Sequence, residues 1–362
     1  MSDGLEGVIA AETVLSEVDG EAGRLVIRGC SLDQLSGHAP YEAVIHLLFE
    51  GFFDDLPDVA ALTTRLGQAR AEVFDQVAAL DADLRGLSTI EAVRALMARL
   101  PDGDDLATAL RLIAAPAVFT PAVARVRQGL APVAPDPGLG HAADVLRMIK
   151  GRAATSAETQ GLDAYLVTVS DHGLNASTFA ARVVASTRAG LTSAVLAGIS
   201  ALKGPLHGGA PGPIIEMLDQ IGEPANARAW IEAALDRGDR LMGFGHRVYR
   251  VRDPRADALK RAVRLLTEGS NAPGRLEFAE AVEDAALAIL KARKPDRSLQ
   301  TNVEFYTALL LESLDFPPDA FTCVFGIGRV SGWIAHAREQ TAGGRLIRPQ
   351  SLYIGPAPLA AA

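Results

Sequence analysis

Helical periodicity constrains the fold of this 362-residue chain more than any other feature of its sequence. Ala and Leu abound, and aromatic residues make up only 5% of the chain, a composition that suits packed helices. Between residues 60 and 130 the periodicity predicts helices with breaks at Pro101 and Pro116. Strand-like alternation is confined to the short segment GRLVIRGCSLDQL, which predicts a strand running into a helix. We therefore expect an all-α fold.

Proline and glycine residues place the other helices and loops. The run YEAVIHLLFEG predicts a helix with Pro40 in its first turn and Gly51 at its end. The Pro- and Gly-rich stretch 131–140 predicts a long loop, and the tail GGRLIRPQSLYIGPAP is not expected to be helical. Further helices are expected near 155–170, 174–188 and 190–203, within 212–315, and from Pro318 through Arg329 to Gln340.

Charge and composition narrow the class of protein. Hydrophobic residues make up 49% of the chain, as in a well-buried globular enzyme. The net charge is -9 and the basic residues are scattered, which argues against a nucleic-acid partner. Cys30 and Cys323 lie in apolar contexts and are expected to be reduced thiols. The acidic N-terminus does not resemble a secretory signal, and the apolar run 191–202 is too short for a membrane span. We expect a cytoplasmic protein without membrane contact.

Three histidines lie among glycines or other small residues, where backbone can approach a ligand closely. His207, in GPLHGGAPG, has the context to donate a hydrogen bond to a developing enolate oxygen, or else to satisfy a carbonyl within a turn. His172, in SDHGLNAST, precedes an apparent helix start and could bind an anion there, or act only as a structural cap. His246 follows GFG and opens an arginine-rich segment.

The segment after His246 has an unusual density of guanidinium groups. Arg247, Arg250, Arg252 and Arg255 suit carboxylates or the phosphates of a nucleotide-bearing cofactor, although a solvated basic loop would look the same. The GFG triplet lacks a third glycine and a preceding strand, so a dinucleotide-binding interpretation is weak.

Two charged residues stand in apolar surroundings. Glu304, in TNVEFY, would have a raised pKa if buried, as a general base requires, or it could be a partly exposed glutamate at a helix start. Arg329, between Gly328 and Gly332, needs an anionic partner if it is buried. Together with the histidines, these residues suit proton abstraction next to a carbonyl.

A metal site is not expected. The chain has no HExxH, no HxH and no paired cysteines, and the three histidines lie far apart in sequence. The other histidines have no comparable context and are expected to be structural; they are His38, His46, His141 and His336.

In order and spacing, these motifs resemble those of the citrate synthase family. The resemblance runs from GLEGVIAAETVLSEVDGEAGRLVIRG to RLIRPQSLYIGP, and the stretch GFGHRVYRVRDPRA is its most specific part. The resemblance implies an all-α homodimer, sometimes assembled further, in which a small domain closes over a large one. The small domain would span 209–315, and the large domain would comprise 1–208 and 316–362.

The resemblance also implies the reaction, which joins acetyl-CoA to oxaloacetate. His207 would stabilise the enol of the thioester, His246 would polarise the ketone of the oxo acid, and Glu304 would be the base. The carboxylates would be bound by His172, Arg255 and Arg329, and by Arg348 reaching across from the partner subunit. Coenzyme A would contact Arg250, Gly243, Phe244, Gly245 and Asn302. The acyl-CoA is a co-substrate, and no permanently bound cofactor is implied.

Three positions depart from the family pattern. Glu304 stands where the family usually has aspartate, and Thr301 stands where proline is common. Gln350 replaces a second arginine of an RPR-type segment, although Arg348 is retained. Two alternatives to citrate synthase stay open: a 2-methylcitrate synthase using propionyl-CoA, and a non-catalytic paralogue that binds an oxo acid or CoA.

Overall fold

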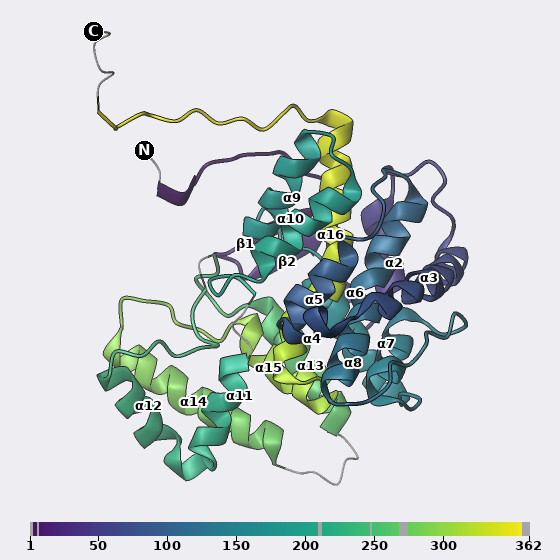
Figure 1. The fold of residues 1–362 in the computed structure, drawn as a ribbon. Helices are drawn as coiled ribbons and strands as arrows, with labels where there is room; N and C mark the ends of the chain where they lie inside the picture. The colour runs from purple at the N-terminus through teal and green to yellow at the C-terminus, as the bar shows by residue number, and fades with distance from the viewer. Residues whose placement is uncertain (1–2, 6, 209–211, 247, 268–273, 357–362) are drawn as a thin grey trace.

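The computed structural model describes residues 3–5, 7–208, 212–246, 248–267 and 274–356. Over these residues the chain is built almost entirely of helices, which confirms the expected all-α class (Figure 1).

The helices follow one another with short connections. The first eight α-helices are α1 (Leu32–Leu35), α2 (Tyr41–Phe49), α3 (Val59–Phe74), α4 (Ala82–Gly86), α5 (Thr89–Met97), α6 (Leu106–Arg127), α7 (His141–Lys150) and α8 (Ser156–Val169). The others are α9 (Ala176–Ser186), α10 (Leu191–Leu202), α11 (Gly212–Ile221), α12 (Ala227–Asp236), α13 (Pro254–Thr267), α14 (Arg275–Arg293), α15 (Val303–Ser313) and α16 (Phe321–Gly343). Short 3-10 turns are η1 (Asp3–Leu5), η2 (Asp75–Ala79), η3 (Pro224–Asn226) and η4 (Pro318–Ala320).

A small antiparallel sheet precedes the helices. Its strands β1 (Ser16–Asp19), β2 (Arg24–Ile27) and β3 (Cys30–Ser31) pair in sequence order, with Glu17 opposite Val26. The predicted strand is therefore confirmed. The turn after β1 lies against the arginine-rich segment, because the Gly20 carbonyl accepts a hydrogen bond from the Arg250 amide at 2.9 Å.

The two longest helices, α6 and α16, form the centre of the core. The two helices pack against each other. Helix α6 also contacts α3 and α5, and helix α16 also contacts α9 and α10. The helix α6 is long and apolar enough to cross a membrane, but 89% of its most apolar stretch is buried within the protein. Its composition is therefore that of a core helix.

The prediction of a helix break at Pro116 is wrong. Pro116 and Pro121 both lie inside α6, and both side chains are buried. An interior proline removes one backbone hydrogen bond and costs about 3 kcal/mol, so only strong packing keeps such a helix continuous. Burial of α6 on every side supplies that packing, and a one-dimensional pattern does not reveal it.

The other predicted elements are confirmed in outline. Helices α8, α9, α10 and α16 fall where periodicity predicts them, and the stretch 131–140 and the described part of the tail are non-helical. Pro40 immediately precedes the first helical residue of α2, and Gly51 follows that helix with a φ of 78°. Cys30 and Cys323 are both unpaired by disulfide.

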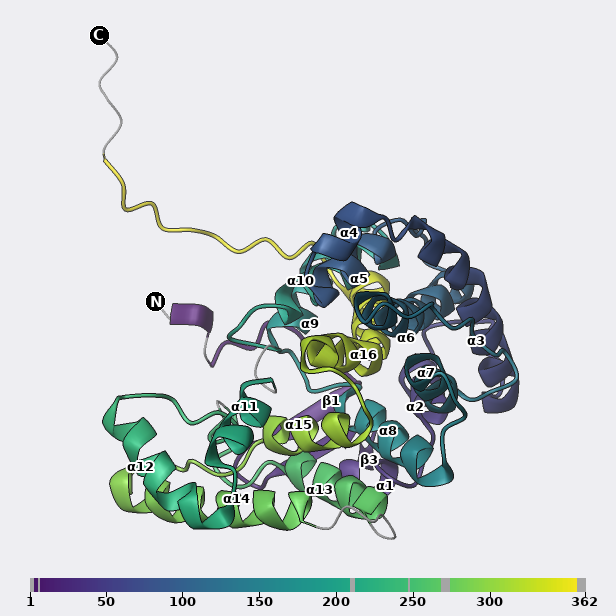
Figure 2. The same cartoon turned by 60° about the horizontal axis from the view of Figure 1, so that its bottom comes forward.

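Helices α11 to α15 lie together on one side of the molecule (Figures 1 and 2). Of these, α13 contacts α8 of the larger helical group, whereas α12 contacts α14. The segment after α16 runs away from the helices as an extended, largely exposed chain (Figure 2). The domain boundaries at 208 and 315 stay a prediction, and residues 209–211 lie outside the described part of the chain.

Candidate active site

Four side chains from two segments that are distant in sequence form a largely buried cluster. The His172 Nε2 lies 3.1 Å from the Tyr249 hydroxyl, and the His172 and His246 rings are 5.7 Å apart edge to face. Arg255, only 4% exposed, places Nη2 at 3.2 Å from the His246 Nε2. The loop between α8 and α9 thus meets the segment that leads into α13, and His172, His246 and Arg255 lie next to one another there.

The hydrogen bonds of His246 define its tautomer. Its Nδ1 accepts from the backbone amides of Val248 and Tyr249 at 3.0 and 3.1 Å, so the ring proton of the neutral imidazole is on Nε2. Burial and the charge of Arg255 lower the pKa of His246 to about 4. The Nε2–H therefore faces the Arg255 guanidinium, and both groups are donors. A substrate oxygen placed against both would give each donor its acceptor.

Asp253 holds Arg255 in place. Its carboxylate accepts from Arg255 Nε at 3.0 Å and Nη2 at 2.8 Å, and from the Val303 amide at 3.1 Å. The last bond connects the arginine-rich segment to the first turn of α15, where Glu304 lies. Asp253 is 1% exposed, so this ion pair is screened little by solvent.

Glu304 lies in the first turn of α15, after the N-cap residue Asn302. The Asn302 Oδ1 accepts from the Glu304 amide at 3.0 Å, and the Asn302 Nδ2 donates to the Gly245 carbonyl at 2.9 Å. One asparagine thus connects the GFGH segment to the start of the helix. Burial raises the pKa of the Glu304 carboxyl to about 7, against the opposing charges of Arg255 and Arg240.

The GFG triplet requires its glycines for conformation. Gly243 and Gly245 have φ values of 86° and 83°, which side chains rarely adopt. A Cβ at Gly243 would also lie 3.0 Å from the Phe305 ring. Backbone hydrogen bonds from Gly245 to Gln300 and from Asn302 to Gly243 then pair this segment with the residues before α15.

His207 lies in the turn after α10 and contacts a polar network. Its Nε2 is 2.8 Å from the Ser177 Oγ, which accepts from the Trp333 indole N–H at 3.2 Å and donates to Asn175 Oδ1 at 2.8 Å. Burial, with the charges of Arg329 and Arg255, lowers the pKa of His207 to about 4. Nε2 of the neutral ring is therefore hydrogen-bonded to Ser177, and Nδ1 is the ring nitrogen that a ligand could contact.

Arg329 has an unsatisfied donor. The side chain is 1% exposed, its Nε donates to the Val169 carbonyl at 2.5 Å, and Nη2 has no hydrogen-bond partner among the described residues. Burial and the like charge of Arg255 lower its pKa to about 10, so it stays cationic at neutral pH. A buried guanidinium with an unused N–H is a site for an anionic oxygen.

Two predicted arginines do not join this cluster. Arg250 is exposed beside the sheet, and Arg348 is exposed on the extended segment after α16. The predicted role of Arg348 in a partner subunit stays a prediction. Arg247 lies outside the described residues.

Four residues that the sequence did not single out orient the site. Tyr249, Asp253, Ser177 and Trp333 all contact a predicted site residue directly. Tyr249 and Asp253 lie within GFGHRVYRVRDPRA and could have been found there, whereas nothing in the sequence connects Ser177 with Trp333.

The comparisons with known proteins decide the family. Residues 4–350 match the family model described as citrate synthase, C-terminal domain. The chain belongs to the citrate synthase family. A citrate synthase from Haloferax volcanii is 36% identical, with 97% of this chain and 95% of that protein aligned. A 2-methylcitrate synthase from Mycobacterium tuberculosis is 35% identical, with 97% of this chain and 90% of that protein aligned.

A solved structure shares the fold of this citrate synthase family member. It is the ternary complex of the Thermoplasma acidophilum citrate synthase with carboxymethyl coenzyme A and oxaloacetate. The TM-score is 0.86 at 30% identity, over 100% of this chain and 98% of that one.

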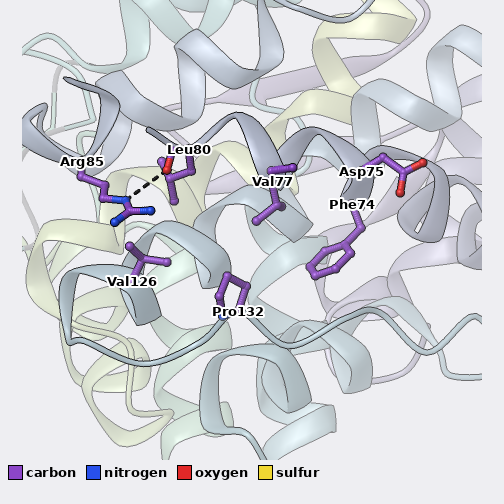
Figure 3. A pocket seen from close by; sticks show the side chains of 8 residues that line it. Phe74, Asp75, Val77, Leu80, Arg85, Val126 and Pro132 are labelled. Carbon is purple, nitrogen blue, oxygen red and sulfur yellow. Dashed lines mark hydrogen bonds between the residues drawn. The ribbon is translucent and has the colours of Figure 1, made fainter. Parts of the chain in front are cut away.

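A surface cavity of about 460 Å³ lies away from this site (Figure 3). Its lining comes from the end of α3, from η2 and α4, and from α6 and the loop after it, and includes Phe74, Val77, Arg85 and Pro132. It contains none of the predicted site residues. Within the described residues, no three His, Cys, Asp or Glu side chains gather in a way that could hold a metal ion.

Proposed function

We propose that this protein condenses acetyl-CoA with oxaloacetate and water to give citrate and free CoA. The observation that carries the proposal is the hydrogen-bonded unit formed by Asn302 with Gly245 and Glu304. It fixes a carboxylate near neutral pKa relative to the His246 segment, which provides donors for a carbonyl oxygen. A base and a carbonyl-polarising group in fixed relation are what carbon–carbon bond formation at a thioester methyl requires.

Glu304 takes a proton from the methyl group of the thioester in the first step. A thioester methyl is a very weak acid, so its enol or enolate needs stabilisation as the proton leaves. Neutral His207 donates a hydrogen bond from Nδ1 to the thioester oxygen, which requires Nε2 to accept the Ser177 hydroxyl proton that is donated to Asn175 Oδ1 in this structure. The carboxyl pKa of about 7 makes Glu304 a stronger base than an exposed glutamate.

The nucleophilic carbon then attacks the ketone of oxaloacetate. The Nε2–H of His246 and the guanidinium of Arg255 polarise the ketone oxygen and stabilise the negative charge that develops on it. His172, Arg255 and Arg329 bind the carboxylates, and Arg348 of a second copy completes the binding. The unused Nη2 of Arg329 supports this role.

Water hydrolyses the resulting thioester and releases CoA. Contacts to CoA are assigned to Arg250, Gly243, Phe244, Gly245 and Asn302, and closure of residues 209–315 over the site excludes water from the earlier steps. The protein acts as a homodimer in the cytoplasm, without a metal or a permanently bound cofactor.

A second candidate is 2-methylcitrate synthase, which uses propionyl-CoA. The similarity to a relative with that name favours it. One additional methylene in an apolar pocket changes discrimination by about 1–3 kcal/mol, so the preferred acyl chain depends on small differences in the pocket.

Release of CoA thiol from acetyl-CoA and propionyl-CoA, with and without oxaloacetate, tests the proposal. We expect release that depends on oxaloacetate, and the ratio of the two kcat/KM values identifies the acyl substrate. Folded protein that binds oxaloacetate but releases no thiol would instead be a non-catalytic paralogue.

A further inference from the structure

A second buried polar network lies next to the cluster of His172, His246, Tyr249 and Arg255, which is called the catalytic cluster below. The second network has no part in the proposed chemistry. Its centre is His336 on α16, with Asp171 on one side and Arg182 on the other, and all three are at most 3% exposed. His336 Nε2 lies 3.2 Å from Asp171 Oδ1, and His336 Nδ1 lies 3.0 Å from Arg182 Nη1. From its sequence context, His336 was expected to be only structural.

The two neighbours of His336 fix its tautomer. Arginine is only a donor, so Nδ1 must be the unprotonated nitrogen that accepts from Arg182. The ring proton is then on Nε2 and is donated to the Asp171 carboxylate. A leucine at this position would leave both a buried carboxylate oxygen and a buried guanidinium N–H without this partner.

The outer end of the network holds both terminal segments. Arg182 pairs with Glu339, and its Nε donates to Gln340 Oε1 at 3.0 Å. Glu339 accepts from the Val14 amide at 2.8 Å, and Gln340 Nε2 donates to the Arg345 carbonyl at 3.0 Å. The position of Arg182 is therefore fixed independently of the catalytic cluster.

The inner end of the network binds the two residues on either side of His172, which are Asp171 and Gly173. Asp171 Oδ2 accepts from the Ser16 hydroxyl at 2.5 Å, and the Ser16 oxygen accepts from the Gly173 amide at 2.9 Å. Both residues that flank His172 are thus held by one set of hydrogen bonds. Close packing supports it, because a Cβ at Gly332, one helical turn before His336, would lie 2.3 Å from the Ser170 carbonyl oxygen.

We propose that His336 is a positioning residue for the oxo acid, which fixes through Asp171 the backbone that presents His172 to the substrate carboxylate. The proposal rests on the proposed function, in which His172 binds oxaloacetate. It assigns to His336 an effect on the affinity for oxaloacetate and not for acyl-CoA, because the hydrogen bonds of the network described above reach both neighbours of His172 but not His207, Ser177 or the GFG segment.

The test compares His336→Leu, His336→Gln and a matched control, His141→Leu. His141 is likewise fully buried with an arginine, Arg70, at 3.4 Å from Nδ1, but it lies on α7. In His336→Leu we expect the KM for oxaloacetate to rise about tenfold, the effect of one lost hydrogen bond to a charged group, and the KM for acyl-CoA to stay within about twofold. Glutamine keeps an N–H donor for Asp171, so His336→Gln recovers most of the oxaloacetate KM.

The control separates positioning from general loss of stability. His141→Leu is expected to lower the unfolding temperature without changing the KM for oxaloacetate. An unchanged oxaloacetate KM in His336→Leu, or an equal rise in His141→Leu, would overturn the proposal. If His336→Leu does not fold, Ser16→Ala replaces it and must give the same selective rise.

Failure of the proposed function would be visible separately. If wild-type protein releases no CoA thiol, the dissociation constant of oxaloacetate is measured by calorimetry for the same variants. A selective loss of affinity in His336→Leu then supports the positioning role, and equal affinities contradict it.

Discussion

Glu304 is the residue whose environment matters most for the reaction. Its carboxyl is largely buried at the start of α15, and burial raises its pKa to about 7 while Arg255 and Arg240 act in the opposite direction. His207 and His246 are neutral at that pH, because burial lowers both pKa values to about 4. The site therefore combines one carboxylate able to accept a proton with two imidazoles able to donate hydrogen bonds.

The first prediction is a pH profile. A base is active when deprotonated, so kcat/KM should fall as the pH drops through about 7, where Glu304 takes up its proton. His207 and His246 should contribute no transition between pH 5 and 8, because both are neutral over that range. Initial rates of thiol release across that range measure the profile, and a flat profile from pH 5 to 8 would contradict the assignment.

The residues of the site differ in how far sequence alone could place them. Each of His172, His246, Arg255 and Arg329 stands in a distinctive segment, so the sequence alone marks it as a candidate, and its role in binding stays a prediction. Ser177 and Trp333 could not, because their meeting at His207 depends on how α9, α10 and α16 pack. Arg348 is exposed in this chain, and its role across subunits stays a prediction.

Helix α16 shows how one element sets the geometry of the site. Gly328, Gly332 and His336 are four residues apart and share one face, which packs against the end of α8 and the loop after it. Periodicity predicted this helix because its apolar pattern is continuous. Periodicity failed at Pro116, because tertiary burial of α6 outweighs the local cost of proline.

The second prediction concerns close packing on α16. Gly332→Ala would place a Cβ 2.3 Å from the Ser170 carbonyl oxygen, and such overpacking costs about 1–3 kcal/mol. We expect a lower unfolding temperature and a higher KM for oxaloacetate. Gly343→Ala, at the end of the same helix, meets no atom within 4 Å and should change neither.

The third prediction concerns the start of α2. Asp163 accepts from the Tyr41 amide at 3.0 Å, and burial raises its pKa from 3.8 to about 7. Because the folded-state pKa lies above the unfolded one, its contribution to stability is greatest below about pH 4 and is lost as the pH rises to about 7. Asp163→Asn should therefore raise the unfolding temperature at pH 8 by a few degrees. Calorimetric scans check this, and an equal gain at pH 4 would contradict it.

At the scale of the whole molecule, the proposed function includes a second copy of the chain, which would contribute Arg348 to the site. The extended segment that bears Arg348 leaves the helical body (Figure 2), and the network around Arg182 holds its base. The sequence predicted two domains and a dimer only through family resemblance, since neither composition nor periodicity contains information on subunit contacts.

The fourth prediction is complementation between inactive subunits. Under the proposed function, Arg348→Ala should damage the site of the neighbouring subunit, whereas Glu304→Gln should damage the site of its own subunit. Mixing the two variants under conditions of subunit exchange should therefore restore activity, because one site in each mixed dimer is intact. Mixtures that stay as inactive as the separate variants would show that Arg348 does not act across subunits.

The most direct measurement is oxaloacetate-dependent release of CoA thiol by the wild-type protein and by Glu304→Gln. The account predicts turnover by the wild type and a loss of about 10²- to 10⁴-fold in kcat for the variant, with oxaloacetate affinity retained. Glu304→Asp, which keeps a carboxylate, should recover part of the rate. An unchanged kcat in Glu304→Gln would contradict its role as the base, and absence of release by the wild type would contradict the proposed reaction itself.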